Sequence, residues 1–187
     1  MTTVESMVRA STMLTATGRA IDINNPDPAS ICIDDIARAL ARSTRFGGHL
    51  GDHVETYSVA QHSILVSQFS PPDLALVGLL HDAAEAYLGD VIGPLRRLLP
   101  AYRELEARFN LAIGEAFGLR DRLLDLPPEV RLADARAMAT EARDLLVDTP
   151  ARRAVFSAEP LGVTIVPLGP WNARDAFLAR FGRLGGI

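Results

Sequence analysis

The sequence predicts an all-α fold, a single-domain helical bundle of about six or seven helices. Apolar residues recur at helical spacing in several long stretches. Prolines and glycines fall at the ends of these stretches, where they start and stop helices. The length of 187 residues suffices for one core and is short for two. We therefore expect one domain over residues 1–187.

The first elements expected along the chain are loops, a short extended piece and a helix. Residues up to about position 30 are rich in Thr, Gly, Asn and Pro, which is typical of turns. The apolar residues 31–33 indicate a short strand or extended piece. Asp34 or Asp35 then caps a helix that ends before Gly47. Its apolar face consists of Ile36, Ala37, Leu40 and Ala41.

The later helices are expected where helical spacing persists between proline and glycine breaks. Residues 74–87 are apolar nearly all round, which predicts a central buried helix. Pro127 and Pro128 open a long helix that passes through Asp134. Residues 163–166 indicate a second extended piece. The predicted helices after the first span residues 57–69, 74–87, 102–117, 128–146 and 172–181.

The composition excludes several classes of function. The net charge is -4, so binding to a nucleic acid through a basic face is not expected. All 19 basic residues are arginines, which excludes lysine nucleophiles, Schiff bases and a phosphate-loop lysine. The single cysteine, Cys32, cannot form an internal disulfide, and no run of about 18 apolar residues indicates a membrane span. We expect a soluble, cytoplasmic protein with no nucleic-acid partner and no membrane partner.

Two of the four histidines stand in apolar helical surroundings. His62 falls within the helix predicted at 57–69, and His81 is followed at once by Asp82 at the end of the most buried helix. Histidine and aspartate are costly there unless they are paired or bind a metal. The alternatives are a hydrogen-bonded pair at a helix end for His81 and Asp82, and a core histidine with satisfied hydrogen bonds for His62.

The spacing of these residues limits how they can share one metal. Adjacent helical residues point about 100° apart, so His81 and Asp82 can serve one ion near a helix end or from its two sides. Glu85 projects from the same side as this pair and is placed to orient or deprotonate a water. A fourth ligand is expected from another helix, and Asp134 is the candidate, a lone carboxylate among small and apolar residues. Glu141, two turns later, either supports the site or faces solvent.

Two histidines and two aspartates form a mixed nitrogen and oxygen ligand set. Such a set suits zinc, manganese, cobalt or iron in the divalent state, and the spacing does not choose among them. A metal held in this way can lower the pKa of bound water and polarise a phosphoryl oxygen. The predicted cofactor is therefore one divalent transition metal, and a second divalent ion bound with substrate phosphates stays open.

These residues lie in segments that resemble the HD-domain superfamily of metal-dependent phosphohydrolases. The likeness is greatest to small bacterial 5'-deoxynucleotidases and phage-type deoxyadenosine triphosphate triphosphohydrolases. It rests on YSVAQHS at 57–63, LHDAAEAYLGD at 80–90 and the Ala133-Asp134 pair, in this order. The His-Asp pair alone is a weak signal, whereas the extended run with its flanking ligands is specific. The resemblance covers roughly residues 30–146, the expected metal-site core, on which residues 147–187 are expected to pack.

The resemblance implies a role for each matching residue. His62, His81, Asp82 and Asp134 match the four metal ligands, and Glu85 matches the catalytic carboxylate beside the metal. The implied fold is the helical bundle of the HD-domain type.

Further matches concern the substrate. Asp90 matches a catalytic aspartate near the scissile phosphate and the sugar, and Arg96 falls where that branch carries a basic phosphate contact. Arg45 and Phe46 resemble an Arg-Trp pair in which the arginine holds phosphate and the aromatic ring packs on the nucleoside. Phenylalanine in place of tryptophan leaves base and sugar selection open, and the following segment is about two residues longer than in the family. His53, within that segment, is a further candidate for substrate binding.

The predicted function is hydrolysis of small (deoxy)nucleotides, with a metal-activated water attacking a phosphate to release nucleoside. Two versions stay open, a 5'-deoxynucleotidase acting on monophosphates and a deoxynucleoside triphosphate triphosphohydrolase. An alarmone hydrolase is disfavoured, because that branch places a second acidic residue after the glutamate, where this chain has Ala86. The alternative from a different class is a non-catalytic nucleotide-binding or interaction module. The predicted partner is the small nucleotide, and the resemblance implies a homo-oligomer.

Overall fold

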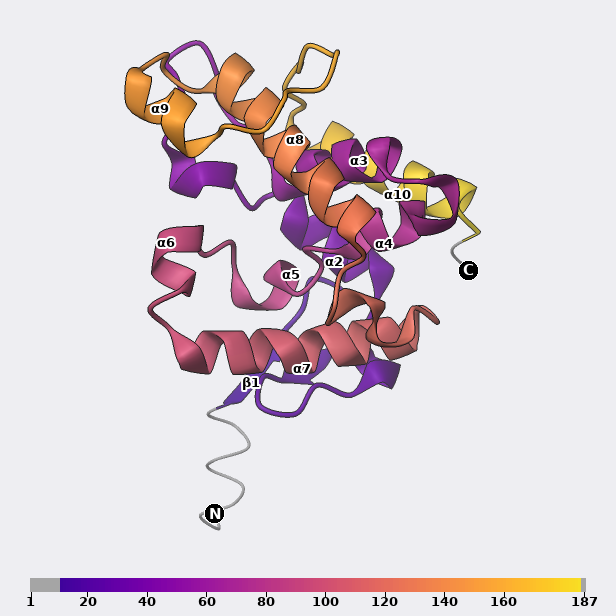
Figure 1. Cartoon of the computed structure of the whole chain (residues 1–187). Helices are drawn as coiled ribbons and strands as arrows, with labels where there is room; N and C mark the ends of the chain where they lie inside the picture. The colour runs from indigo at the N-terminus through magenta and orange to yellow at the C-terminus, as the bar shows by residue number, and fades with distance from the viewer. Residues whose placement is uncertain (1–10, 186–187) are drawn as a thin grey trace.

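The computed structural model describes residues 11–185, which form a mostly helical molecule with one short antiparallel hairpin (Figure 1). The mostly helical composition agrees with the predicted all-α class. In chain order the elements are β1 (Thr12–Leu14), β2 (Ala20–Asp22), η1 (Pro28–Ser30), α2 (Ile33–Leu40), η2 (Arg45–Gly48), α3 (Val59–Phe69), η3 (Pro72–Leu74), α4 (Ala75–Leu80), α5 (Glu85–Leu88), α6 (Gly93–Arg96), α7 (Pro100–Ala116), η4 (Arg120–Leu123), α8 (Pro128–Leu145), α9 (Pro150–Val155) and α10 (Pro170–Arg183).

A hairpin of β1 and β2 lies within the part of the predicted N-terminal loop region that the structure describes, and residues 23–27 after it are irregular, as predicted; residues 1–10 lie outside the described part. Met13 pairs with Ile21, and the turn between the strands contains Gly18 at a φ of 83°. The side chain of Ile21 is fully buried, so the hairpin contributes to the core. Three-residue strands are too short for a period-2 pattern to mark them in a sequence.

Helix α2 confirms the first predicted helix and corrects its start. The helix begins at Ile33, so residues 31–33 are not a strand, and the residue at the N-cap is Cys32 rather than Asp34 or Asp35. Asp34 and Asp35 lie in the first turn, where negative charge favours a helix. The Asp35 carboxylate accepts hydrogen bonds of 2.8 and 2.7 Å from the backbone amide and the hydroxyl of Thr17. It therefore ties the hairpin to α2.

The helices that carry the candidate metal ligands pack closely against one another. Helix α3 contacts α4, α8 and α10, and most of the buried apolar residues of these helices belong to one large cluster with those of α2 and α7. Gly78 lies where α4 crosses α3. A Cβ atom at this position would lie 2.6 Å from Ser70 Oγ and 3.2 Å from Ser67 Cα, so a glycine is needed for this approach. This packing sets α3 and α4 side by side.

The single buried helix predicted for residues 74–87 is wrong in detail, because it is interrupted after Leu80. Helix α4 ends there, residues 81–84 form turns, and α5 begins at Glu85. The Ala83 amide donates to the Leu80 carbonyl and the Glu85 amide to the Asp82 carbonyl, both at 3.0 Å. These bonds span three residues instead of four, so the backbone is tighter than an α-helix at His81 and Asp82.

The extended piece predicted at 163–166 forms no strand, because side chains bind its backbone instead. The Ile165 amide donates to Asp144 Oδ2 at 2.9 Å. Gln61 donates to the Val166 carbonyl at 2.7 Å and accepts from the Leu168 amide at 2.8 Å. Asp144 lies on α8 and Gln61 on α3, so this segment is held across the two helices.

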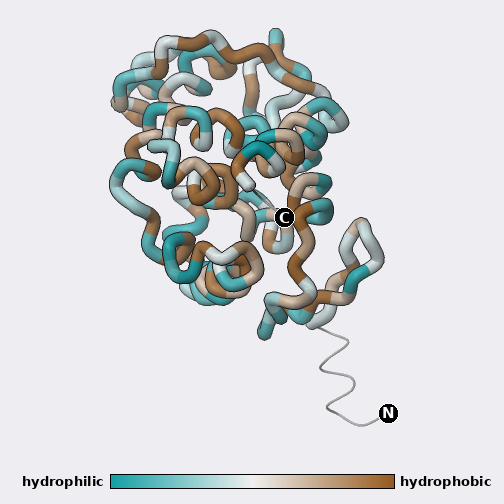
Figure 2. The backbone as a smooth tube through the Cα atoms, turned by 90° about the vertical axis from the view of Figure 1, so that its right-hand side faces the viewer, coloured by the Kyte–Doolittle hydropathy of each residue, from teal (hydrophilic) through white to brown (hydrophobic). Residues whose placement is uncertain are grey.

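The remaining elements enclose this centre. Helix α7 runs along the lower side in Figure 1, with the hairpin next to it and α6 at its N-terminal end. Figure 2 shows hydrophobic and hydrophilic residues alternating along the helices, as expected for helices with one face in a core. Among residues 11–185, no helix has the length and apolar character needed to cross a membrane.

Candidate metal centre

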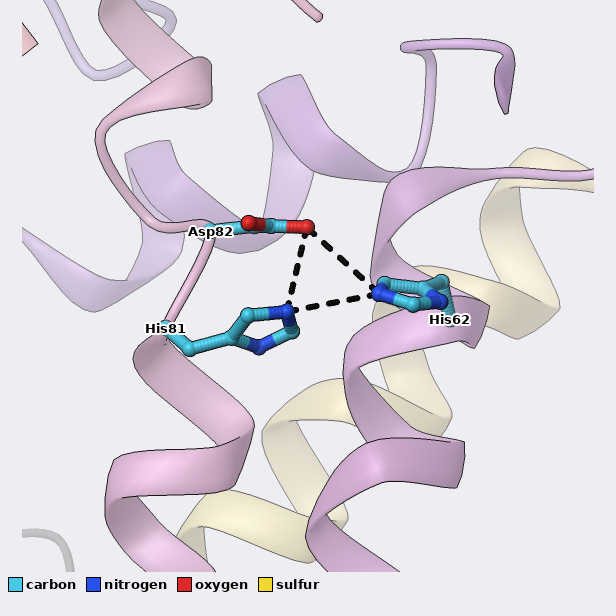
Figure 3. A group of neighbouring side chains, drawn as sticks. All are labelled: His62, His81 and Asp82. Atoms are coloured by element: carbon cyan, nitrogen blue, oxygen red, sulfur yellow. Dashed lines mark hydrogen bonds and ion pairs between the residues drawn. The ribbon is translucent and has the colours of Figure 1, made fainter. Parts of the chain in front are cut away.

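His62 reaches the centre of the molecule from the first turns of α3. The Ser58 side chain caps this helix by accepting a 3.2 Å hydrogen bond from the Gln61 amide. His62 is fully buried, and its Nε2 atom faces the end of α4 (Figure 3). An imidazole in this position needs polar partners for both ring nitrogens.

His81 and Asp82 project to one point from the interrupted end of α4. The Nδ1 atom of His81 lies 2.9 Å from the Gly78 carbonyl, so this nitrogen carries the hydrogen and Nε2 is left for a ligand role. Its Nε2 atom lies 3.2 Å from Asp82 Oδ2. The tight turns after Leu80 direct both side chains toward His62, as Figure 3 shows.

The three ligand atoms are spaced as atoms on a single ion would be. His62 Nε2 lies 3.3 Å from His81 Nε2 and 3.5 Å from Asp82 Oδ2, and all three atoms lie within 4.8 Å of one another. Ligands about 2.0–2.2 Å from one tetrahedral ion lie ~3.3–3.6 Å apart. This group of nitrogen and oxygen donors could therefore hold a metal ion, as the sequence predicts.

Asp134 approaches the same nitrogens from α8. Its Oδ1 atom lies 3.2 Å from His62 Nε2 and 3.9 Å from His81 Nε2. The side chain is 28% exposed, the most open of the four predicted ligands. The structure thus brings all four predicted ligands together, with Asp134 on the solvent side of the group.

Glu141 lies behind His62 and does not face solvent, which excludes one of the two alternatives left open by the sequence. Its side chain is fully buried on α8. The Oε1 atom lies 2.6 Å from His62 Nδ1 and accepts a 3.0 Å hydrogen bond from the Tyr57 hydroxyl. A carboxylate on the second nitrogen of a histidine is the usual support of a metal-binding imidazole.

Arg45 places a buried positive charge beside the group. Its backbone amide donates to the Tyr57 carbonyl at 2.9 Å, which fixes the start of η2 next to α3. The guanidinium lies 3.6 Å from Asp82 Oδ2 and 3.5 Å from Glu141 Oε2. These are long ion pairs, and the Nε atom of Arg45 has no hydrogen-bond partner among the described residues. Electrostatic attraction to these two carboxylates therefore holds the arginine next to the candidate metal ligands.

Phe46 follows Arg45 in a conformation that is rare for a bulky residue. Its φ is 57°, within the left-handed region. The Phe156 ring, just after α9, meets the Phe46 ring edge-on at a centroid distance of 5.9 Å. Backbone strain of this kind is often found at functional sites. The Phe46 ring centroid lies 5.6 Å from the guanidinium carbon of Arg45, and its packing on a nucleoside stays a prediction.

Glu85 and Asp90 bring further carboxylates to the same region. Glu85 is 7% exposed, and its Oε2 atom has no hydrogen-bond partner among the described residues. The Oδ2 atom of Asp90 is buried and also lacks such a partner. Glu85 is the first residue of α5, and Asp90 follows the turn at Gly89 that ends this helix. Two unpaired buried carboxylate oxygens are costly unless they serve a ligand.

Burial and neighbouring charges shift the pKa values of the site residues in different directions. Burial, together with Asp82 and Asp90, raises the pKa of Glu85 well above its usual value. Burial would also raise the pKa of Asp82, but His81 and His62 outweigh it and lower that pKa. Burial and the Arg45 charge lower the pKa of His62, but Glu141 and Asp134 outweigh them and raise it to about 10. Asp82 is thus ready to bind a cation, and the Glu85 carboxylate binds a proton more tightly than an ordinary glutamate does.

Two predicted substrate contacts lie outside the group. Arg96 Nη2 forms a 2.9 Å ion pair with Glu106 Oε2, and its side chain is 43% exposed. The Nε2 atom of His53 lies 2.9 Å from the Asp144 carbonyl, at the C-terminal end of α8. The structure does not place either residue against the metal ligands, so their roles in substrate binding stay predictions.

The partner residues Tyr57 and Glu106 could not be assigned from the sequence. The pattern around Tyr57 indicates only the start of a helix, and nothing in its neighbours signals a hydroxyl directed at Glu141. Glu106, the partner of Arg96, lies in an amphipathic helix where an acidic residue normally faces solvent. The position of Glu141, two turns after Asp134 on one helix, is the signal that points to a support of the site.

Comparison with known proteins places the chain among bacterial relatives. It is 40% identical over 164 residues to "Uncharacterized protein YfdR" of Escherichia coli, a match that covers 87% of each chain. It is 35% identical over 179 residues to "Uncharacterized protein RCAP_rcc00048" of Rhodobacter capsulatus, covering 87% of this chain and 90% of the relative. No family model matches the chain. The names of both relatives state no activity, so common descent alone assigns none.

Proposed function

The chain belongs to the family of the Escherichia coli protein YfdR, and we propose that it is a metal-dependent phosphohydrolase of the HD-domain type that acts on small nucleotides. The observation that carries this proposal is the convergence of His62 Nε2, His81 Nε2 and Asp82 Oδ2 within 4.8 Å of one another. Asp134 is proposed as the fourth ligand, because its carboxylate approaches both imidazoles.

The proposed ligands suit the chemistry of phosphate hydrolysis. A divalent metal held by them would lower the pKa of water and polarise a phosphoryl oxygen. Arg45 lies against Asp82, so its guanidinium can neutralise charge on the phosphate oxygens of a substrate next to the ligands. The buried position of this arginine strengthens the electrostatic attraction, because little water screens it.

Glu85 is proposed as the proton acceptor for the attacking water. Its carboxylate is buried beside Asp82 and Asp90, and its Oε2 atom is free of hydrogen bonds from the described residues. A carboxylate whose pKa is raised by burial accepts a proton from water more readily than an ordinary glutamate does. Asp90 follows on the same side and can orient the leaving group or the sugar through its own unpaired oxygen.

The resemblance to the HD-domain superfamily supports the same assignment. The ordered motifs that carry it contain the four proposed ligands. His62 comes from the YSVAQHS segment, His81 and Asp82 from the LHD segment, and Asp134 from α8. A helical fold is also what that superfamily implies.

The charges around the site favour monophosphates over triphosphates. Among the described residues, Arg45 is the arginine in ion-pair contact with a proposed metal ligand. Arg96 is paired with Glu106, and the carboxylates of Glu85 and Asp90 add negative charge. A triphosphate carries more negative charge than one arginine and one metal neutralise. We therefore propose a 5'-nucleotidase activity, with a deoxynucleotide as the substrate that the resemblance favours.

Product analysis tests the proposal. The protein is incubated with Mn²⁺ or Co²⁺ and with each common nucleoside monophosphate and triphosphate, and the products are separated by chromatography. We expect free phosphate and nucleoside from monophosphates, and none from the His81→Ala/Asp82→Ala variant. Triphosphate released from one deoxynucleotide would instead identify a triphosphohydrolase. A metal-loaded protein that hydrolyses none of them would overturn the proposed activity and favour a non-catalytic binding module.

A further inference from the structure

Glu141 is in contact with three residues from outside its own helix. It is fully buried on α8, and its carboxylate faces His62, Tyr57 and Arg45. None of the roles given above to metal ligands, base or substrate contacts uses it. A buried carboxylate carries a large desolvation cost unless its charge is used, so its position requires an explanation.

The first contact sets the direction of a metal ligand. Glu141 Oε1 lies 2.6 Å from His62 Nδ1, the short distance of a charge-assisted hydrogen bond. With Nδ1 engaged as donor, the lone pair of the imidazole is on Nε2. That atom faces the other proposed ligands at 3.2 to 3.5 Å. Glu141 thus selects the ring tautomer and orientation that a metal needs.

The second contact fixes the carboxylate itself. The Tyr57 hydroxyl donates a 3.0 Å hydrogen bond to the same Oε1 atom. Tyr57 is fully buried and packs in a small apolar cluster with Val54 and Leu145. The tyrosine therefore locks the Glu141 side chain without adding charge.

The third contact is with Arg45, the cation proposed to bind the substrate phosphate. Glu141 Oε2 lies 3.5 Å from Arg45 Nη2, and both side chains are buried. The other partner of this guanidinium is Asp82, at 3.6 Å. A metal bound to Asp82 would share the charge of that carboxylate and would repel the guanidinium. Glu141 would then be the ion-pair partner that keeps Arg45 in place.

We propose that Glu141 is a positioning residue that holds the metal ligand His62 and the anion-binding Arg45 in one arrangement, so that a divalent metal and a phosphate-bearing ligand bind cooperatively. The inference rests on the proposed metal site, and it goes beyond it by assigning a residue and a linkage between the two ligands. Linkage of this kind is reciprocal, so each ligand tightens the other by the same factor.

The test uses Co²⁺ and inorganic phosphate as probes on the full chain. The affinity for Co²⁺ is measured by visible absorption and chelator competition, with and without phosphate. In the wild-type protein phosphate should raise the affinity for Co²⁺ by about 5-fold or more. The Glu141→Gln variant should bind Co²⁺ about 10- to 100-fold more weakly and lose most of the phosphate effect. Glu129→Gln, the same change on the exposed first turn of α8, should match the wild type in both values.

If Glu141 had a merely structural role, its replacement would lower the affinity for Co²⁺ and leave the phosphate effect unchanged. Loss of the phosphate effect therefore indicates a positioning role. A folded Glu141→Gln variant with wild-type Co²⁺ affinity, or with an unchanged phosphate effect, would overturn the inference. Should this variant fail to fold, Tyr57→Phe provides the test, because it removes one donor to Oε1 and no charge. Here a several-fold loss of Co²⁺ affinity together with a smaller phosphate effect supports the inference, and an unchanged phosphate effect overturns it. A wild-type protein that binds no Co²⁺ would contradict the proposed metal site itself. This result is distinct from the comparison of Co²⁺ affinities between variant and wild type, which tests the role of Glu141.

Discussion

The Nε2 atom of His81 and the Oδ2 atom of Asp82 lie 3.2 Å apart, although adjacent residues of a regular helix point about 100° away from each other. The interruption of the helix after Leu80 resolves this conflict, because tight turns over residues 81–84 bring both side chains to one side. The pair therefore forms, together with His62, a group of three candidate metal ligands.

Removing either member of this pair should abolish metal binding. Asp82→Asn keeps the shape of the side chain but loses its charge, and His81→Ala removes the ligand nitrogen. We expect each purified variant to retain no metal after gel filtration, as measured by mass spectrometry of the metal content. Asp73→Asn, the same change on the exposed η3 turn, should keep the wild-type content. Full metal content in Asp82→Asn would exclude that residue as a ligand.

Replacing Glu85 should separate catalysis from metal binding. The Glu85→Gln side chain cannot accept a proton, and general-base catalysis contributes about 10²- to 10⁴-fold. We expect kcat for the nucleotide substrate to fall within that range while the metal content stays unchanged. Glu115→Gln, on the exposed side of α7, is the matched control and should leave kcat unaffected. Loss of the metal together with kcat would instead make Glu85 a ligand.

Metal binding should release protons at neutral pH. In the metal-free protein, burial and Arg45 lower the pKa of His62, but Glu141 and Asp134 outweigh them and raise it to about 10. A metal needs the unprotonated Nε2 atom, so we expect its affinity to increase as the pH rises from about 6.5 towards 10. Calorimetry in buffers of different ionisation enthalpy measures the protons released. A count of zero at pH 7 would contradict the raised pKa.

The stability of the metal-free protein should fall over the same range of pH. Because the folded pKa of His62 lies above the unfolded value of 6.5, its proton stabilises the fold fully below pH 6.5. That stabilisation is lost as the pH rises through about 10. Thermal unfolding of chelator-treated protein should show a declining midpoint, and His62→Gln should flatten the decline. A thermal midpoint that rises over this pH range would contradict the predicted loss of stability.

A methyl group at Gly114 should destabilise the packing of α7 against η4. A Cβ atom there would lie 1.9 Å from the Arg120 carbonyl oxygen, so α7 and η4 would have to separate. We expect Gly114→Ala to lower the free energy of unfolding by about 1–3 kcal/mol or more, as overpacking does. Gly182→Ala is the control, because nothing lies within 4 Å of its added Cβ and it falls within α10. That change should be neutral or stabilising in chemical denaturation.

Phe156 should influence substrate binding through Phe46. Loss of the edge-on contact frees the Phe46 ring, and such aromatic pairs contribute about 0.5–1.5 kcal/mol. We expect Phe156→Leu to raise KM for a nucleoside monophosphate several-fold with little change in kcat. Inhibition by inorganic phosphate should stay unchanged, because phosphate lacks the nucleoside. Equal weakening of phosphate and nucleotide would argue against a nucleoside contact at Phe46.

The long helices and the approach of the four candidate ligands to one another were predictable, because their signals are local or strongly patterned. Pro128 stands in the first turn of α8 and marks its start, whereas α7 and α10 begin at Pro100 and Pro170, ahead of the starts predicted at residues 102 and 172. Scarce histidines and lone carboxylates in apolar helices marked the candidate ligands, because such groups need partners when buried.

The features that sequence reasoning missed depend on contacts between distant residues. The backbone at 163–166 is bound by Asp144 and Gln61, so its apolar run does not become a strand. The burial of Glu141 depends on three residues distant in the sequence, and no proline or glycine marks the break after Leu80. Tertiary packing overrides local preference in each case.

The most direct test of the central claim is a titration of metal-stripped protein with Mn²⁺ or Co²⁺ while nucleoside release from a nucleoside 5'-monophosphate is followed. We predict no turnover without metal, a rise that saturates once the His62, His81, Asp82 and Asp134 site is filled, and no rise in Asp82→Asn. Turnover that persists in excess chelator, or its absence in metal-loaded protein with every nucleotide, would contradict the claim.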